Sequence, residues 1–155
     1  MPSDMFTHLS DRDLSAILSY VRHVPRHGGP QTDVHVRLLG RVGVIVGQFT
    51  PVADRIRQAP ASATDASDLG RYLALTSCTE CHGQDFRGKD PAPDLRVIAA
   101  YDQPTFIHFM RTGTAVGGRE LGLMSRVARS RFSHFTDEEV AALYGYLRGV
   151  AGQTR

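Results

Sequence analysis

The chain has 155 residues, of which 41% are hydrophobic and 22% charged, and its formal net charge is +2 at pH 7. These values predict a globular chain with one ordinary domain, or a small domain with an extension, and exclude an intrinsically disordered protein. The net charge is too small to indicate a nucleic-acid-binding protein. No apolar run reaches the length of about 20 residues that a membrane-spanning helix needs. Residues 1–10 lack the cationic start and the apolar stretch of a secretory signal.

The first predicted element is an amphipathic helix within residues 6–24. Leu14, Ile17, Leu18 and Val21 follow one another at i, i+3, i+4 and i+7, which places them on one face of a helix. Ser10 and Asp13, just before this apolar pattern, form a weak version of the capping box that begins many helices.

Residues 26–64 are predicted to be a linker or strap. Glycine and proline interrupt this segment at residues 28–30 and at Pro51, and small residues fill 59–67. Its middle, residues 34–48, is expected to be either a short helix or an extended segment that packs against the domain that follows.

The only two cysteines of the chain stand in one Cys-x-x-Cys-His run, from Cys78 to His82, after a short predicted helix that begins near Leu69. This pattern is typical of covalent attachment of c-type haem, in which each thiol bonds a vinyl group and the histidine binds the iron. On a helical turn Cys78 and Cys81 lie on one side, because they are three residues apart. The sequence therefore predicts one haem c, with its iron, per chain.

Two other readings of the Cys-x-x-Cys pair stay open. A structural zinc site usually has four ligands, often a second ligand pair, and the chain has no further cysteine. A thioredoxin-like redox pair is expected in a βαβ context, and the sequence shows no strand pattern of that kind.

After the Cys-x-x-Cys-His run the sequence predicts a loose loop with Gly83 and Gly88, and then an extended segment over residues 91–95. A helix over 103–111 follows, begun by Asp102 and ended by Gly113. Residues 113–130 are predicted to form a long loop that contains Met124. No strand is expected in this part of the chain.

The last predicted helix lies within residues 132–150 and begins at a capping box of Thr136 and Glu139. It repeats residues 6–24 at an offset of 126 residues. Seven of the nineteen aligned pairs are identical, where unrelated segments would share about one: Phe6/Phe132, His8/His134, Asp11/Asp137, Ala16/Ala142, Tyr20/Tyr146, Arg22/Arg148 and Val24/Val150. We interpret residues 1–25 as the tail of a preceding domain of the same kind; the alternative is convergent patterning of two ordinary helices.

Residues 65–155 resemble a class I cytochrome c domain in motifs that occur in the family's order. They are Gly70 eight residues before the first cysteine, the Cys78–His82 run, Pro93-Asp94-Leu95, Met124, and the C-terminal Leu143, Tyr146 and Leu147. The wider chain resembles the C-terminal part of bacterial dihaem or multihaem cytochrome c subunits, which serve membrane-bound dehydrogenases.

The resemblance implies a mostly α-helical fold of three to four helices around one haem, with an N-terminal helix and linker as an extension. It divides the chain into residues 1–25, which resemble the tail of a preceding cytochrome c domain, the linker 26–64, and the monohaem domain 65–155. Gly70 would let the first helix of this domain cross the last one closely, near Leu143 and Tyr146.

The resemblance also implies the roles of the site residues. The carbonyl group of Pro93 would accept the Nδ1 proton of His82, and Met124, 42 residues after His82, would be the sixth iron ligand. Met110, His108 and His134 are the other candidates for that ligand. With both axial positions filled by protein, the expected function is electron transfer within a larger redox complex, without a catalytic residue.

Two functional alternatives remain open. One is a haem enzyme or sensor with an open iron site, as in a peroxidase; the other is a structural docking subunit with an incidental haem. Covalent haem attachment in bacteria takes place outside the cytoplasm. We therefore expect the protein in the periplasm or at the outer face of the cytoplasmic membrane, although this chain contains no signal sequence.

Protein redox partners are expected, and neither nucleic acid nor a membrane-spanning segment; membrane association would come through a complex. Arg126, Arg129 and Arg131 follow Met124 closely and would either steer an acidic redox partner or neutralise the haem propionates. Met1 or Met5 would complete a haem carried by another chain, unless Met1 is simply an initiator residue.

Overall fold

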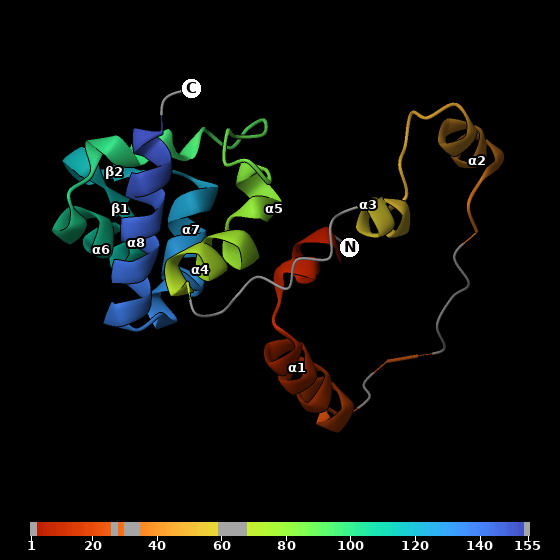
Figure 1. Cartoon of the computed structure of the whole chain (residues 1–155), viewed down its shortest axis with the longest axis horizontal. Coiled ribbons are helices and arrows are strands. Elements are labelled where there is room, and N and C mark those ends of the chain that lie inside the picture. The colour runs from red at the N-terminus through yellow and green to blue at the C-terminus, as the bar shows by residue number, and fades with distance from the viewer. Residues whose placement is uncertain (1–2, 26–27, 30–34, 59–67, 154–155) are drawn as a thin grey trace. The chain divides into compact units, whose positions relative to one another are not determined.

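The computed structural model describes residues 3–25, 28–29, 35–58 and 68–153, and the chain divides into two compact units, Met1–Ala63 and Thr64–Arg155. The helices of the first unit are the 3-10 helix η1 (Ser3–His8), α1 (Asp11–His23), α2 (Leu38–Ile45) and α3 (Val52–Gln58), which Figure 1 labels in part. The second unit contains α4 (Leu69–Ser77), α5 (Thr79–His82), η2 (Leu95–Ala100), α6 (Gln103–Thr112), β1 (Thr114–Ala115), η3 (Val116–Gly118), β2 (Arg119–Glu120), α7 (Leu123–Ser130), η4 (Phe132–His134) and α8 (Asp137–Gly152).

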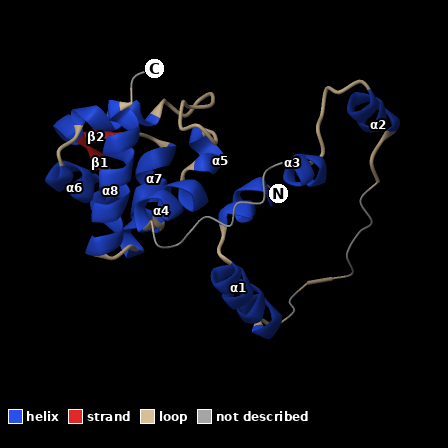
Figure 2. Ribbon diagram, in the orientation of Figure 1, coloured by secondary structure: helices blue, strands red, loops and turns tan. Residues whose placement is uncertain are grey.

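The prediction of a mostly helical fold, which the resemblance to class I cytochromes c implies, is confirmed (Figure 2). Within the described ranges, no helix combines the length and the apolar character that crossing a bilayer requires. Of the two forms expected for the middle of the linker, the structure has the helix, as α2. The helix α3 was not predicted; it directly follows Pro51, and proline is common where a helix begins.

The starts of α6 and α8 and the end of α6 lie where the sequence predicts them, whereas α8 continues to Gly152, beyond its predicted end at residue 150. Asp102 accepts a hydrogen bond from the Thr105 amide, and α6 ends at Gly113, whose φ of 73° is left-handed and therefore favours glycine. Thr136 and Glu139 form the complete capping box of α8, with hydrogen bonds of 3.2 and 2.7 Å in the two directions.

The prediction of a long loop over residues 113–130 is wrong. A short antiparallel hairpin pairs Thr114 with Glu120 and Ala115 with Arg119, and α7 follows it. The expectation of no strand is therefore also wrong for these residues. The apolar residues of α7 do follow a helical spacing, at Leu123, Met124, Val127 and Ala128, but the helix has only eight residues, which is short for such a pattern to stand out in the sequence. Met124 consequently lies in the first turn of a helix rather than in a loop.

The core of the second unit depends on the close crossing of α4 and α8. A Cβ atom built on Gly70 would overlap the carbonyl oxygen of Ala142 and would lie 2.9 Å from the Cβ of Tyr146. Leu143, between these two contacts, is fully buried. The crossing that the cytochrome c resemblance implies near Leu143 and Tyr146 is therefore present, and it requires a residue without a side chain at position 70.

We expect Gly70→Ala to destabilise the haem-loaded chain. Alanine gains about 1 kcal/mol of helix propensity, but overpacking against a backbone carbonyl costs typically about 1–3 kcal/mol, so the loss outweighs the gain. The matched control is Gly145→Ala, because Gly145 is exposed in α8 and nothing lies within 4 Å of its added Cβ. In denaturant unfolding, the midpoint concentration should fall for Gly70→Ala and stay the same or rise for Gly145→Ala. Equal midpoints for the two variants would contradict the close crossing of α4 and α8.

Candidate functional site

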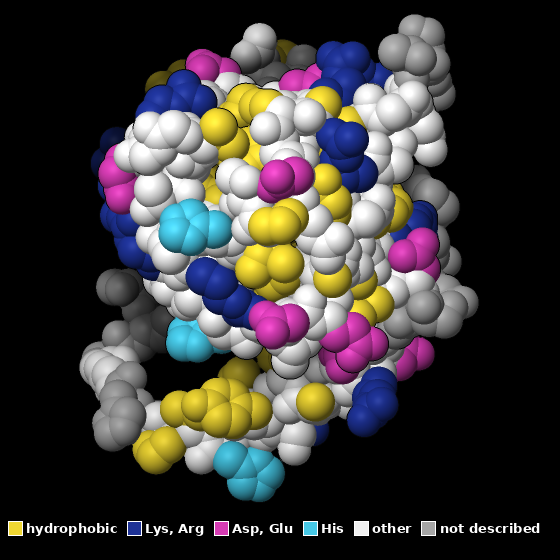
Figure 3. All heavy atoms as spheres, turned by 90° about the vertical axis from the view of Figure 1, so that its left-hand side faces the viewer, with side chains coloured by type: hydrophobic (Ala, Val, Ile, Leu, Met, Phe, Trp, Pro, Cys, Tyr) yellow, Lys and Arg dark blue, Asp and Glu magenta, His cyan; other side chains and the backbone are white. Residues whose placement is uncertain are grey.

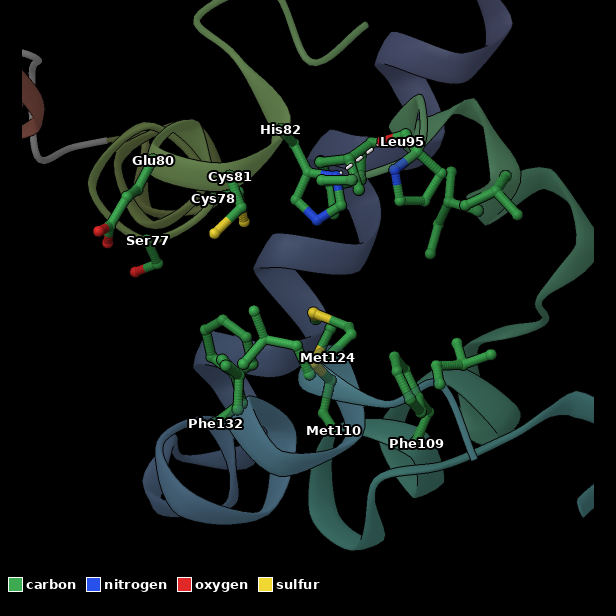
Figure 4. A pocket seen from close by; sticks show the side chains of 18 of the residues that line it. Ser77, Cys78, Glu80, Cys81, His82, Leu95, Phe109, Met110, Met124 and Phe132 are labelled. Atoms are coloured by element: carbon green, nitrogen blue, oxygen red, sulfur yellow. Dashed lines mark hydrogen bonds between the residues drawn. The ribbon is translucent and has the colours of Figure 1, made fainter. Parts of the chain in front are cut away.

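A cavity of ≈ 650 Å³ opens in the second unit, and its wall is mostly apolar (Figure 4). This volume lies within the range of cofactor and ligand pockets. The wall is formed by residues of α4, α5, α6, α7, η4 and α8 and of the chain between α5 and α6. Its buried or half-buried side chains include Leu95, Ile98, Phe106, Phe109 and Phe132. The cavity is therefore built by the same elements that form the core.

Both cysteines line this cavity. The amide of Cys78 donates to the carbonyl of Ala74 and that of His82 to Cys78, each over 2.9 Å, so that α4 and α5 join at Cys78 with almost no break. Cys78 is buried, whereas Cys81 is exposed. The continuous helical turn thus brings the two thiols to one side of the pocket (Figure 4).

The pKa of a thiol speaks against a redox pair, and the absence of further ligands among the described residues speaks against a zinc site. Burial, with a smaller contribution from Cys81, raises the pKa of the Cys78 thiol to about 12. Reactive redox cysteines instead have lowered pKa values, because the thiolate is the attacking form. Among the described residues, no three His, Cys, Asp or Glu side chains come together to hold a metal ion.

His82 is buried, and its ring is held by the backbone of Pro93. Its Nδ1 lies 2.8 Å from the carbonyl oxygen of Pro93. Since a carbonyl oxygen only accepts, Nδ1 carries the proton, and Nε2 faces the pocket with a free lone pair (Figure 4). Such a bond fixes the ring orientation and raises the basicity of a metal-binding histidine. This is the contact that the cytochrome c resemblance implies.

The loop between His82 and Pro93 is tight, so the expectation of a loose loop is wrong. The Gly88 amide donates to the carbonyl of His82 over 2.9 Å, and Gly88 has a φ of 92°. A Cβ atom there would lie 2.7 Å from the backbone of Pro93 and Ala92. Gly88 therefore lets the chain return closely enough for the Pro93 carbonyl to reach the histidine ring.

The structure reduces the candidates for a second axial ligand from four to two. Met124 and Met110 both lie on the wall opposite His82 (Figure 4). Met110 is buried in the core, and Met124 is half-buried at the start of α7. His108 and His134 are exposed and do not line this cavity. The choice of Met124 over Met110 stays a prediction.

Ser125, next to Met124, was missed in the sequence. Its side chain is fully buried, and its hydroxyl donates to the carbonyl of Gly113 and accepts from the Leu121 amide at 2.8 Å. It thereby joins the end of α6 to the start of α7. A lone serine beside a candidate ligand gives no sequence signal for this role, because both its partners are backbone groups.

We expect Ser125→Ala to lower stability by roughly 1–3 kcal/mol, since the buried carbonyl of Gly113 and the part-buried amide of Leu121 lose their partner. Ser130→Ala is the control, because Ser130 is exposed at the other end of α7; surface changes usually stay within about 0.5 kcal/mol. Thermal unfolding followed by haem absorption measures both. Equal midpoints for the two variants would show that Ser125 does not hold α7 in place.

Of the three arginines in the basic cluster predicted after Met124, the structure pairs one with an acidic side chain. Arg129 pairs with Glu120 over 2.9 and 3.1 Å and lowers the pKa of that carboxyl group. Arg126 and Arg131 are exposed, and neither forms an ion pair with another described residue. Basic and acidic side chains are interspersed over the face that Figure 3 shows. None of the three arginines lines the cavity.

The predicted role of the N-terminal methionines stays untested. Met1 lies outside the described residues, as does the side chain of Met5, whose backbone belongs to η1.

The residues of the pocket fit a covalently bound haem. Two thiols stand at one edge of an apolar cavity, and a buried imidazole turns its unprotonated nitrogen inward between them and a wall with two thioethers. Three comparisons with known proteins were made. No curated protein and no solved structure matches the chain. The sequence pattern of the family "Cytochrome c" matches residues 67–151, more than half of the chain. The chain therefore belongs to the cytochrome c family.

Proposed function

We propose that the second unit transfers single electrons through one haem c bound to Cys78 and Cys81, with His82 and Met124 as axial ligands. The observation that carries the proposal is the position of Met124 on the wall opposite the free Nε2 of His82, in an apolar pocket edged by both thiols. The bound haem supplies an iron centre that accepts and releases one electron.

The chain's own residues favour a carrier over an enzyme. The Pro93 carbonyl holds the His82 ring and leaves it little freedom to move away. A methionine ligand raises the reduction potential relative to a second histidine. The apolar wall keeps water away from the cofactor. Two protein ligands leave no open position for oxygen or peroxide, which a peroxidase-like enzyme or a gas sensor would need.

The ligand state of the whole chain, purified with its haem, tests this proposal. We expect a low-spin ferric spectrum and a ferrous form that does not take up carbon monoxide at neutral pH. A high-spin ferric spectrum with rapid carbon monoxide binding would instead support the enzyme or sensor with an open site. If an intact complex still transferred electrons at full rate without this haem, the chain would be a docking subunit.

We further propose that the protein is exported and works as a subunit or domain of a larger redox complex related to dihaem or multihaem cytochromes c. Cytochrome c domains of bacteria are typically periplasmic, which supports the location. Arg126 and Arg131, which form no ion pair with any residue in the described part of the chain, would steer an acidic partner. Reduction of that partner should slow as ionic strength rises, and less so after Arg126→Gln and Arg131→Gln.

A further inference from the structure

The repeat between α1 and α8 extends from the sequence to the backbone. In each copy a 3-10 turn precedes the helix, with a hydrogen bond from Leu9 to Phe6 (3.2 Å) and from Phe135 to Phe132 (3.1 Å). These two bonds are related by the same offset of 126 residues as the sequence repeat. Two helices with merely similar apolar patterning need not share their entry turn.

The N-caps of the two helices also correspond. Ser10 has φ and ψ of −64° and 151°, and Thr136 has −67° and 165°. Each side chain accepts a hydrogen bond from the amide three residues later, over 3.1 Å from Asp13 and 3.2 Å from Glu139. The alternative of two ordinary, unrelated helices is therefore less well supported than the repeat.

The matching faces of the two helices have opposite environments. In α8, Val140 and Leu143 are 0% exposed and Leu147 is 3% exposed. Their counterparts in α1 are Leu14 at 38%, Ile17 at 45% and Val21 at 58% exposed. A contiguous apolar face of this kind, retained on an otherwise polar helix, marks an interaction surface.

The neighbours of α8 indicate what would cover α1. Gly70 of α4 allows the close crossing at Ala142 and Tyr146, and both residues recur in α1, as Ala16 and Tyr20. The ring of Tyr146 packs edge-on against Phe86, with centroids 6.1 Å apart, whereas Tyr20 is 72% exposed. The occupant of the α1 face should therefore offer a glycine at the crossing and an aromatic ring for Tyr20.

A polar contact adds a third requirement. The guanidinium of Arg148 donates to the carbonyl of Ala99 over 3.1 Å, and its counterpart in α1 is Arg22. A glycine on α4, the ring of Phe86 in the loop after α5 and the carbonyl of Ala99 in η2 are thus the neighbours that the second unit gives its last helix.

We propose that the apolar face of α1 docks a second cytochrome c-type domain, on this polypeptide or on a partner chain, and serves as its closing helix. In that domain α1 takes the place that α8 has in residues 64–155. The proposal rests on the family assignment and on the repeat. It does not depend on whether Met124 binds iron, so its tests can fail independently of the proposed function.

A helix graft tests whether α1 encodes this packing. In the full chain, residues 137–150 are replaced by the sequence of residues 11–24, which keeps the apolar stripe, the alanine and the tyrosine. We expect the graft to retain covalent haem and a cooperative unfolding transition. Its midpoint should shift modestly downward, because Leu18 replaces Tyr144 and the hydrogen bond from Tyr144 to the Tyr101 carbonyl is lost.

The matched control exchanges the alanine and the tyrosine within the same graft. Composition and length stay the same, but tyrosine now stands at the crossing with Gly70. We expect this version to lose most of its haem-loaded yield. If the two grafts behave alike, or if neither binds haem, α1 does not carry the packing of a closing helix and the proposal is overturned.

Photo-crosslinking in the native host identifies the occupant. A photoreactive phenylalanine analogue is placed at Ile17 on the apolar face or, as a control, at Ser19 on the exposed opposite side of α1. The proposal expects crosslinks from position 17 to a glycine-bearing helix that precedes another Cys-x-x-Cys-His run, and few from position 19. Crosslinks only to residues 64–155 of this chain or of a second copy, only to proteins without that run, or equally from both positions would overturn it.

Discussion

Replacing Met124 with leucine should remove the methionine–iron absorption band near the red end of the spectrum and lower the midpoint potential of the haem. Leucine has nearly the volume of methionine, so the pocket wall stays filled, and such exchanges usually cost less than about 1.5 kcal/mol. The loss therefore reports on the sulfur atom. Absorption spectra of the ferric protein and a redox titration measure the two effects.

Met110→Leu is the matched control for this prediction, because Met110 lines the same wall of the cavity. Met110 is 4% exposed and packs in the core, which is the ordinary use of a flexible thioether side chain. The band and the potential should survive its replacement. If Met110→Leu removes the band and Met124→Leu does not, the ligand is Met110, and α6 rather than α7 carries it.

The Met110 variant also separates stability from ligation. A small drop in unfolding midpoint with an unchanged band is the result expected of a core residue. A ferric spectrum that stays low-spin in both single variants, and changes only when both methionines are replaced, would mean that either thioether can bind. That result would contradict a ligand set fixed by the backbone of α7.

The sequence predicted those features of the fold that depend on local chemistry. The side chains of Asp102, Thr136 and Glu139 each accept a hydrogen bond from a backbone amide within one helical turn. The helices α6 and α8 begin directly after Asp102 and Thr136. The tight crossing at Gly70 was expected from the resemblance to class I cytochromes c and not from local chemistry, because its partners Ala142 and Tyr146 are distant in the chain.

The features that sequence reasoning missed depend on contacts between distant residues. The hairpin of Thr114 to Glu120 has only two residues in each strand, too few for a period-2 pattern. Ser125 holds α7 through the backbone of Gly113 and Leu121, which no side-chain pattern reveals. In the sequence, Gly88 cannot be told from any other loop glycine. Its role depends on the close approach of the backbone at Pro93, which only the structure shows.

The residues of the candidate site also differ in whether neighbouring residues or distant contacts determine their position. Cys78, Cys81 and His82 are adjacent in the chain, so one helical turn is enough to bring them together. The choice between Met110 and Met124 has no local signal, since methionine fills cores and binds iron with the same side chain. Tertiary structure removes His108 and His134 by exposing them, but it leaves both methionines at the pocket wall.

Replacing both Cys78 and Cys81 with alanine should abolish covalent haem attachment, because no other thiol exists in the chain. Each single variant should keep one thioether bond and therefore a covalently bound haem at reduced yield. Mass spectrometry of the denatured protein measures this directly, since a haem that is bound only through the iron is lost on unfolding. The expected series is the mass of the chain plus haem in the parent and, at lower yield, in each single variant, and the mass of the chain alone in the double variant.

The two single variants should differ in stability. Cys78 is buried at the junction of α4 and α5, whereas Cys81 is exposed at the rim of the pocket. Removing the Cys78 sulfur leaves a void beside the core, which Cys81→Ala does not, so the first variant should unfold at the lower denaturant concentration. Equal midpoints would contradict the packing at Cys78, and haem that remains attached in the double variant, or a parent chain that holds zinc in place of haem, would overturn the haem site.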